Sequence, residues 1–174
     1  MGRYVIPFFT FTMLWISVFS TDVLANEELS REEILQQRMA YYIHFGEFLV
    51  PWYYLAAIDQ YERNIQSVRS DIPKRDSVIA IQFSEEYWNG PLNSTDGDSP
   101  ASDISYFGGV GLDGNGDGIA DRNNDEDIIY TMASYLSQFG LEEENFRLAL
   151  YEYYYTEEAV NQIMTIAKIY KHFN

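Results

Sequence analysis

The sequence predicts a mostly helical α+β domain, with a small β region in its middle and an export signal in front of it. Apolar residues recur at helical spacing in the first and last thirds of the chain. Residues 78–83 (VIAIQF) instead form a short β-branched run, which is typical of a strand. The segments between are rich in glycine, proline and aspartate, as loops are. No internal repeat is visible, so we expect one domain.

Residues 1–25 have the pattern of a secretory signal. Arg3 gives a positive start, residues 5–19 form an apolar run, and residues 23–25 (VLA) offer a small-residue cleavage site. The run is shorter than the ~20 apolar residues of a membrane span, so an uncleaved anchor is the alternative. Cleavage would leave residues 26–174 as one domain with a core of its own, away from the membrane.

Composition limits the possible partners. A formal net charge of −16 argues against binding to nucleic acid or to anionic membrane surfaces. The chain has no cysteine, which fits export by a Gram-positive bacterium without reliance on disulfides. Its 15 tyrosines and 3 tryptophans offer rings that suit carbohydrate faces, and equally an ordinary core. We expect a monomer.

Caps and spacing predict the first two helices. Residues 30–33 (SREE) form a capping box that begins a helix running to about Phe45, and Gly46 ends it. Pro51 suits the first turn of a second helix, at residues 51–65 (PWYYLAAIDQYERNI).

Two acidic side chains fall on the apolar side of this second helix. At ~100° per residue, Asp59 and Glu62 lie within the arc that holds Leu55 and Ile58. Burial disfavours the ionised form of a carboxyl group, so a glutamate there becomes a proton donor near neutral pH. The alternative is that the helix surfaces at its C-terminal end and Arg63 pairs with one of the two.

The remaining elements follow from the same signals. The middle of the chain is predicted as connector, strand, helical turn, polar loop and strand, at residues 64–77, 78–83, 84–90, 91–103 and 104–107. The last third is predicted as three helices, at residues 127–139, 142–155 and 157–173. Gly140 closes the first of these helices and Thr156 caps the last.

Residues 113–127 (DGNGDGIADRNNDED) predict a calcium site. Oxygen-bearing side chains stand at positions 1, 3, 5 and 9 of a loop with glycine at position 6, as in loops that wrap Ca²⁺. Position 12 is Asn124 rather than glutamate, so an acidic residue among 125–127 would complete the shell, or the site is weak. The alternative is an Asx-Gly turn with solvated charges. The expected ligands are the side chains of Asp113, Asn115, Asp117 and Asp121 and the carbonyl of Ile119.

Three segments resemble the lysozyme-like domain of bacterial lytic transglycosylases. They are residues 51–64 (PWYYLAAIDQYERN), 107–136 (FGGVGLDGNGDGIADRNNDEDIIYTMASYL) and 148–170 (LALYEYYYTEEAVNQIMTIAKIY). In that family they carry the catalytic acid, a glycine-rich stretch with a calcium loop, and a tyrosine of the cleft. The resemblance implies a lysozyme-like helical fold, Glu62 as general acid and base, and Tyr151 and Tyr106 as sugar-binding side chains.

Almost all of residues 26–174 is also similar to the N-terminal region of a family of secreted cell-wall hydrolases of spore-forming bacteria. Those proteins carry a lysostaphin-type zinc endopeptidase domain behind this region, and that domain is associated with cutting the L-alanyl–D-glutamate bond of peptidoglycan stem peptides. A zinc site of that type needs several histidines, whereas this chain holds only His44 and His172, far apart in sequence.

Three positions depart from the transglycosylase pattern. Arg63 follows Glu62 where serine is usual, residues 108–111 (GGVG) replace a Gly-Leu-Met-Gln-like strand, and Glu152 follows Tyr151 where asparagine is usual. Three functions at peptidoglycan therefore stay open. They are transglycosylase-like cleavage of the glycan strand by Glu62, glycan binding without catalysis, and a calcium-dependent structural role.

Overall fold

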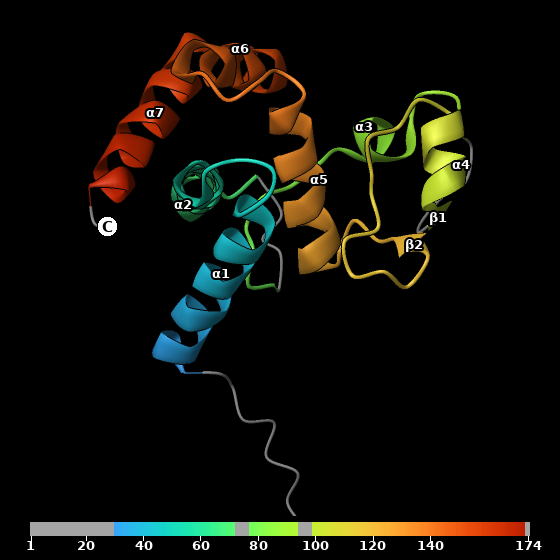
Figure 1. Cartoon of the computed structure of the whole chain (residues 1–174), viewed down its shortest axis with the longest axis horizontal. Coiled ribbons are helices and arrows are strands. Elements are labelled where there is room, and N and C mark those ends of the chain that lie inside the picture. Colours follow the sequence, from blue (N-terminus) through green and yellow to red (C-terminus); the bar gives the residue numbers. More distant parts are fainter. Residues whose placement is uncertain (1–29, 72–76, 94–98, 173–174) are drawn as a thin grey trace, which may run out of the picture.

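The computed structural model describes residues 30–71, 77–93 and 99–172, drawn in colour in Figure 1. The predicted signal, residues 1–25, lies outside the described residues. Within them the chain forms seven helices and one two-stranded antiparallel sheet, so the prediction of a mostly helical protein with a small β region is confirmed.

The first two helices form where their caps predict them. Helix α1 (Arg31–Gly46) begins at the capping box, in which the Ser30 N–H donates to a Glu33 carboxylate oxygen at 2.7 Å. Helix α2 (Trp52–Val68) follows Pro51 and runs three residues further than predicted. Gly46 allows the two helices to meet, because a Cβ atom there would lie 2.8 Å from the Cα of Trp52.

Both strands predicted in the middle of the chain are wrong. Residues 78–83 belong to no helix or sheet, and side chains rather than a strand bind part of their backbone. The Gln66 side chain donates to the Ala80 carbonyl, and an Asp125 carboxylate oxygen accepts from the Val78 N–H. Residues 104–107, predicted as a strand, lie at the end of helix α4 (Ala101–Tyr106), where Ile104 is buried.

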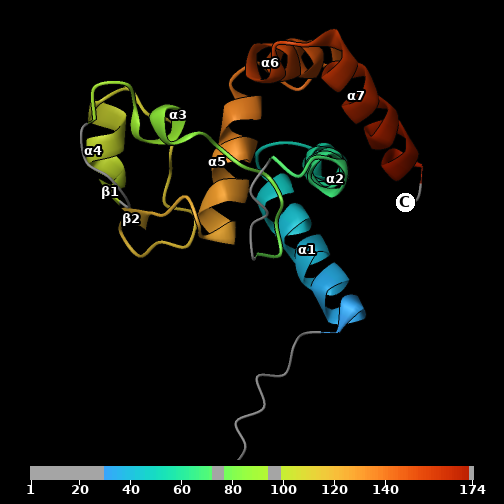
Figure 2. The same cartoon turned by 180° about the vertical axis from the view of Figure 1, so that it is seen from behind.

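The small region of the protein consists of short elements. Helix α3 (Glu85–Asn89) precedes strand β1 (Ser99–Pro100), which leads into α4, and strand β2 (Ile119–Ala120) pairs with β1. Figure 1 and Figure 2 show this region on one side of helix α5 (Asp125–Ser137), with α1 and α2 on the other side. α5 therefore separates the small region from the larger helical part.

Three helices complete the chain, all within about two residues of their predicted bounds. After α5 come α6 (Glu143–Tyr154) and α7 (Glu157–Lys171), and the Thr156 hydroxyl caps α7 by accepting from the Ala159 N–H at 3.2 Å. One buried cluster joins α2, α5, α6 and α7. Its largest fully buried side chains on these helices include Leu55, Ile58, Ile128, Met132, Phe146 and Leu150.

Candidate functional site

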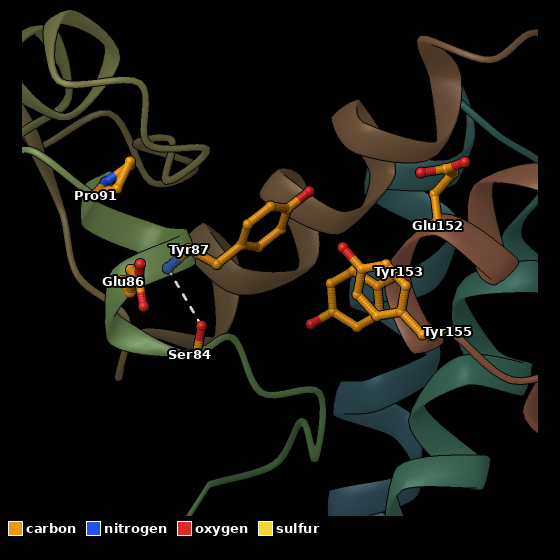
Figure 3. Close-up of a pocket in the computed structure, with 7 residues that line it drawn as sticks. All are labelled: Ser84, Glu86, Tyr87, Pro91, Glu152, Tyr153 and Tyr155. Carbon is orange, nitrogen blue, oxygen red and sulfur yellow. Dashed lines mark hydrogen bonds between the residues drawn. The ribbon is translucent and has the colours of Figure 1, made fainter.

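A groove of about 470 Å³ lies between α3 and the C-terminal end of α6 (Figure 3). Three tyrosines from these two elements line it, so we call it the tyrosine groove. Its lining residues are Ser84, Glu86, Tyr87 and Pro91 on the α3 side and Glu152, Tyr153 and Tyr155 on the α6 side.

The α3 wall is held in place by its cap and by the glycines behind it. The Ser84 hydroxyl accepts from the Tyr87 N–H at 3.2 Å and begins the helix. Residues 108–111, which replace the Gly-Leu-Met-Gln-like strand of the transglycosylases, bind this helix: the Val110 N–H donates to the Tyr87 carbonyl at 3.2 Å. Gly109 lies against the backbone of α3, because a Cβ atom there would stand 2.3 Å from the Trp88 carbonyl oxygen.

Contacts among rings fix the other wall. Tyr153 lies edge-on to Phe83, with ring centroids 5.6 Å apart, and 6.0 Å from Tyr87. Its hydroxyl donates to the Gln82 carbonyl at 2.7 Å, and burial raises the pKa of Tyr153. Tyr155 behaves differently, because the residue is 79% exposed and its backbone is left-handed, with φ of 55°. The groove thus has one fixed and one exposed tyrosine on its α6 side.

Glu62 is connected to this groove through tyrosines. It is half-buried, and the Tyr154 hydroxyl donates to its Oε1 at 2.6 Å. Burial raises the pKa of Glu62, while the hydrogen bond from Tyr154 opposes the rise. Within the described ranges no lysine, arginine or histidine pairs with Glu62. Glu62 itself is not among the groove-lining residues, although its charge also raises the pKa of Tyr153.

Asp59 has a structural role, because its carboxylate joins three parts of the fold. It is buried and accepts from Arg63 Nε at 2.9 Å and from the Tyr42 hydroxyl at 2.6 Å. It also accepts from the Ala80 N–H, so it joins α1, α2 and the segment 78–83. Burial and the charge of Asp59 raise the pKa of Tyr42 above its usual range. Arg63 therefore pairs with Asp59, as the alternative interpretation of this helix expects, and among the described residues Glu62 has no cationic partner.

The two tyrosines that the resemblance implies lie outside the groove lining. Tyr151 on α6 is 42% exposed, and Tyr106 at the end of α4 is 84% exposed. Their sugar-binding roles stay predictions. The sequence did not single out Tyr87, Tyr153 or Tyr155 individually. The tyrosine run at residues 153–155 is a signal for the last two, and no signal in the sequence points to Tyr87.

Aspartate side chains of the loop at residues 113–127 accept hydrogen bonds from the loop's own backbone. Asp113 accepts from the N–H groups of Gly116 at 2.6 Å and Gly118 at 2.7 Å, and buried Asp127 accepts from those of Gly114 and Asp121 at 2.7 and 2.8 Å. Burial raises the pKa of Asp127.

The other oxygen groups of the loop have similar roles. Asp117 accepts from the Ile119 N–H, Asn115 bonds Asp117, and Asn124 caps α5. In the part of the chain that the structure describes, no three acidic or histidine side chains lie close enough together to hold a metal ion. Calcium at this loop therefore stays a prediction from the spacing of its oxygens.

The two histidines lie on different helices. His44 is in the last turn of α1, with its ring edge-on to Phe45, and His172 caps the end of α7. Such a location for His172 suits the negative end of a helix dipole.

The chain is similar to the L-Ala–D-Glu endopeptidase of Bacillus subtilis (strain 168), with 38% identity over 160 residues. The alignment covers 91% of this chain and 49% of that enzyme, so the chain spans about half the length of the curated relative that it matches. No protein-family model and no solved structure matches the chain. None of the described helices is long and apolar enough to cross a membrane. The chain is therefore homologous to part of a bacterial L-Ala–D-Glu endopeptidase.

Proposed function

We propose that this chain is a secreted protein that acts on peptidoglycan, binds the glycan strand in the tyrosine groove and cleaves it with Glu62. The bond named for the B. subtilis relative occurs in the stem peptides of peptidoglycan, which supports the cell wall as the place of action. The observation that carries the reaction is the state of Glu62, a half-buried carboxyl group of raised pKa with no basic partner among the described residues.

The reaction needs one carboxylic acid. Glu62 would donate its proton to the glycosidic oxygen as the bond from that oxygen to C1 breaks. The resulting carboxylate would take the proton of the sugar's C6 hydroxyl, whose oxygen then bonds to C1 and closes an anhydro ring. No water attacks, so the second carboxylate of ordinary glycosidases is not required. Burial favours the protonated form of Glu62 that the first step uses.

The tyrosines would orient the sugar and the acid. Sugar rings pack against aromatic faces, which Tyr87 and Tyr153 offer in the groove. The Tyr154 hydroxyl holds one carboxylate oxygen of Glu62 in a fixed direction. Tyr151 lies one helical turn before Tyr155, so it would extend the contacts along a longer strand, and Tyr106 is proposed as a further contact.

Mass spectrometry of digestion products tests the proposal. The purified protein should release muropeptides with anhydro ends from sacculi, and Glu62→Gln should lower that release at least about 100-fold, as removal of a general acid does. Glu158→Gln is the matched control, because Glu158 is an exposed carboxylate whose charge also acts on Tyr61 next to Glu62. Full release by Glu62→Gln would show that Glu62 is not the acid.

Glycan binding without catalysis is the second candidate. The position of Glu62 favours it, because Glu62 accepts a hydrogen bond from Tyr154 and is not among the groove-lining residues. In this case the protein should sediment with sacculi but release no muropeptides. Tyr153→Ala should then weaken sedimentation, while Glu62→Gln should leave it unchanged.

A further inference from the structure

We propose that the tyrosine groove selects glycan strands whose amino sugars carry free, protonated amino groups rather than N-acetyl groups. This inference rests on the function proposed above and names the substrate class of the same groove. Three features of the lining support it: its charge, its hydrogen-bonding groups and its rings.

Among the described residues, the lining carries two carboxylates and no basic side chain. Glu86 comes from α3 and Glu152 from α6, and Figure 3 shows them on opposite sides of the tyrosine rings. Among the described residues neither has a lysine or arginine partner. Arg122, which lies next to α3, pairs with Glu85 at 3.6 Å and donates to the Phe83 carbonyl. A ligand between Glu86 and Glu152 therefore meets negative charge from two sides.

The hydrogen-bonding groups distinguish the two forms of the sugar. An ionised carboxylate only accepts hydrogen bonds, and a protonated amine only donates them, with three N–H groups. An N-acetyl group is uncharged and keeps one N–H donor beside a carbonyl acceptor and a methyl group, so it offers a carboxylate one hydrogen bond and no ion pair. Hydroxyl groups such as those of Ser84 and Tyr87 serve either form of sugar, so Glu86 and Glu152 decide the preference.

The rings add to the attraction of a cation. The faces of tyrosine rings carry negative potential and attract ammonium groups, most strongly where water is partly excluded. Tyr155 keeps a large exposed ring at the groove on a left-handed residue, with φ of 55°, a conformation that side-chain-bearing residues seldom adopt. This conformation ends α6, where Tyr155 is the C-cap, and it leaves the ring exposed at the groove.

The test compares two soluble oligosaccharides that differ only in acetylation. Calorimetric titration of the purified protein should show about tenfold tighter binding of a glucosamine tetramer than of an N-acetylglucosamine tetramer, as two weakly shielded ion pairs would give. Glu86→Gln and Glu152→Gln should each reduce this ratio, and the double variant should abolish it. Glu85→Gln is the matched control, because Glu85 neighbours Glu86 on α3 but is not among the groove-lining residues, and it should keep the wild-type ratio.

The outcomes separate this inference from the proposed function. Equal affinity for the two tetramers would overturn the preference and leave glycan binding intact. Failure to bind either tetramer would overturn the proposed function together with the inference. A stem peptide with a free side-chain amine that displaces the glucosamine tetramer from the groove, and binds more tightly than it, would overturn the assignment to a sugar. Circular dichroism of each variant confirms that it is folded.

Discussion

Asp59 and Glu62 stand three residues apart on α2, yet their partners give them different properties. Asp59 is surrounded by donors, namely Arg63, the Tyr42 hydroxyl and the Ala80 N–H. Glu62 has the Tyr154 hydroxyl as its one donor within the described residues. The charge of Asp59 is therefore compensated and structural, whereas the charge of Glu62 is poorly compensated and suits proton transfer.

Removal of the Asp59 carboxylate should destabilise the fold. Asp59→Ala leaves the Ala80 N–H without its acceptor and Arg63 without its carboxylate partner, and we expect a loss of about 2–4 kcal/mol in the free energy of unfolding. Urea unfolding followed by tryptophan fluorescence measures it. Asp71→Ala is the control, because it breaks an exposed pair with Arg69 and should leave the midpoint unchanged. Equal midpoints for both variants would contradict the structural role of Asp59.

Glu62 should make the stability of the protein depend on pH. Its pKa in the folded protein is raised, so its stabilising contribution is complete below the pKa of an unfolded glutamate and is lost as pH rises through the folded pKa. Glutamine stays neutral at every pH. Glu62→Gln should therefore have a higher Tm than the wild type at neutral pH, with the difference vanishing below about pH 4. Calorimetry across this range measures it, and an offset that does not change with pH would contradict the raised pKa.

At the scale of elements, α3 depends on the glycine segment behind it. The segment binds the carbonyls of Tyr87 and Trp88 through the N–H groups of Val110 and Gly111. α3 has only five residues and would not be stable alone, so the position of Tyr87 in the groove follows from this contact. The segment at residues 108–111 therefore positions one wall of the groove without lining it.

Gly109→Ala should therefore disturb the groove. The new methyl group would meet backbone atoms of α3, which must shift, and we expect several-fold weaker glycan binding and a lower Tm. Gly108→Ala is the matched control, because a Cβ atom at Gly108 would meet nothing within 4 Å. Its φ of 79° still makes alanine unfavourable at this position. This control should lose about 1 kcal/mol of stability and keep its affinity for glycan. Binding isotherms and thermal melts of both variants decide the matter, and equal affinities would contradict the role of Gly109.

At the scale of the whole molecule, the parts that the sequence predicts well are those with local signals. The capping box at Ser30 and the cap at Thr156 place α1 and α7, because each signal lies within the element that it begins. Residues 78–83 mislead, because an apolar β-branched run is typical of a strand, while its real partners come from α2 and from Asp125. No local pattern reports such distant side chains.

The groove likewise could not be predicted from local sequence signals. Helical spacing is enough to put Glu62 on the inner side of α2. The pairing of Tyr87 with Tyr153 depends on two segments far apart in the sequence, which only the folded arrangement of α3, α5 and α6 brings together. The difference between Asp59, which accepts from the Ala80 N–H, and Glu62, which does not, likewise depends on where residues 78–83 run.

Calcium binding, which the spacing of residues 113–127 predicts, would act on the whole molecule. The loop contains β2, and the Trp88 indole N–H donates to the Ala120 carbonyl at 3.2 Å, so the loop is tied to α3 and thus to the groove. Bound calcium should raise the free energy of unfolding by about 2.7 kcal/mol at 100 times its Kd. Thermal melts in millimolar calcium and in chelator should therefore differ.

Asp117→Asn, which keeps an oxygen for the Ile119 N–H but removes the charge, should reduce that difference. Identical melts in calcium and chelator would identify the loop as a hydrogen-bonded turn, stabilised by side chains such as Asp113 and Asp127 without an ion.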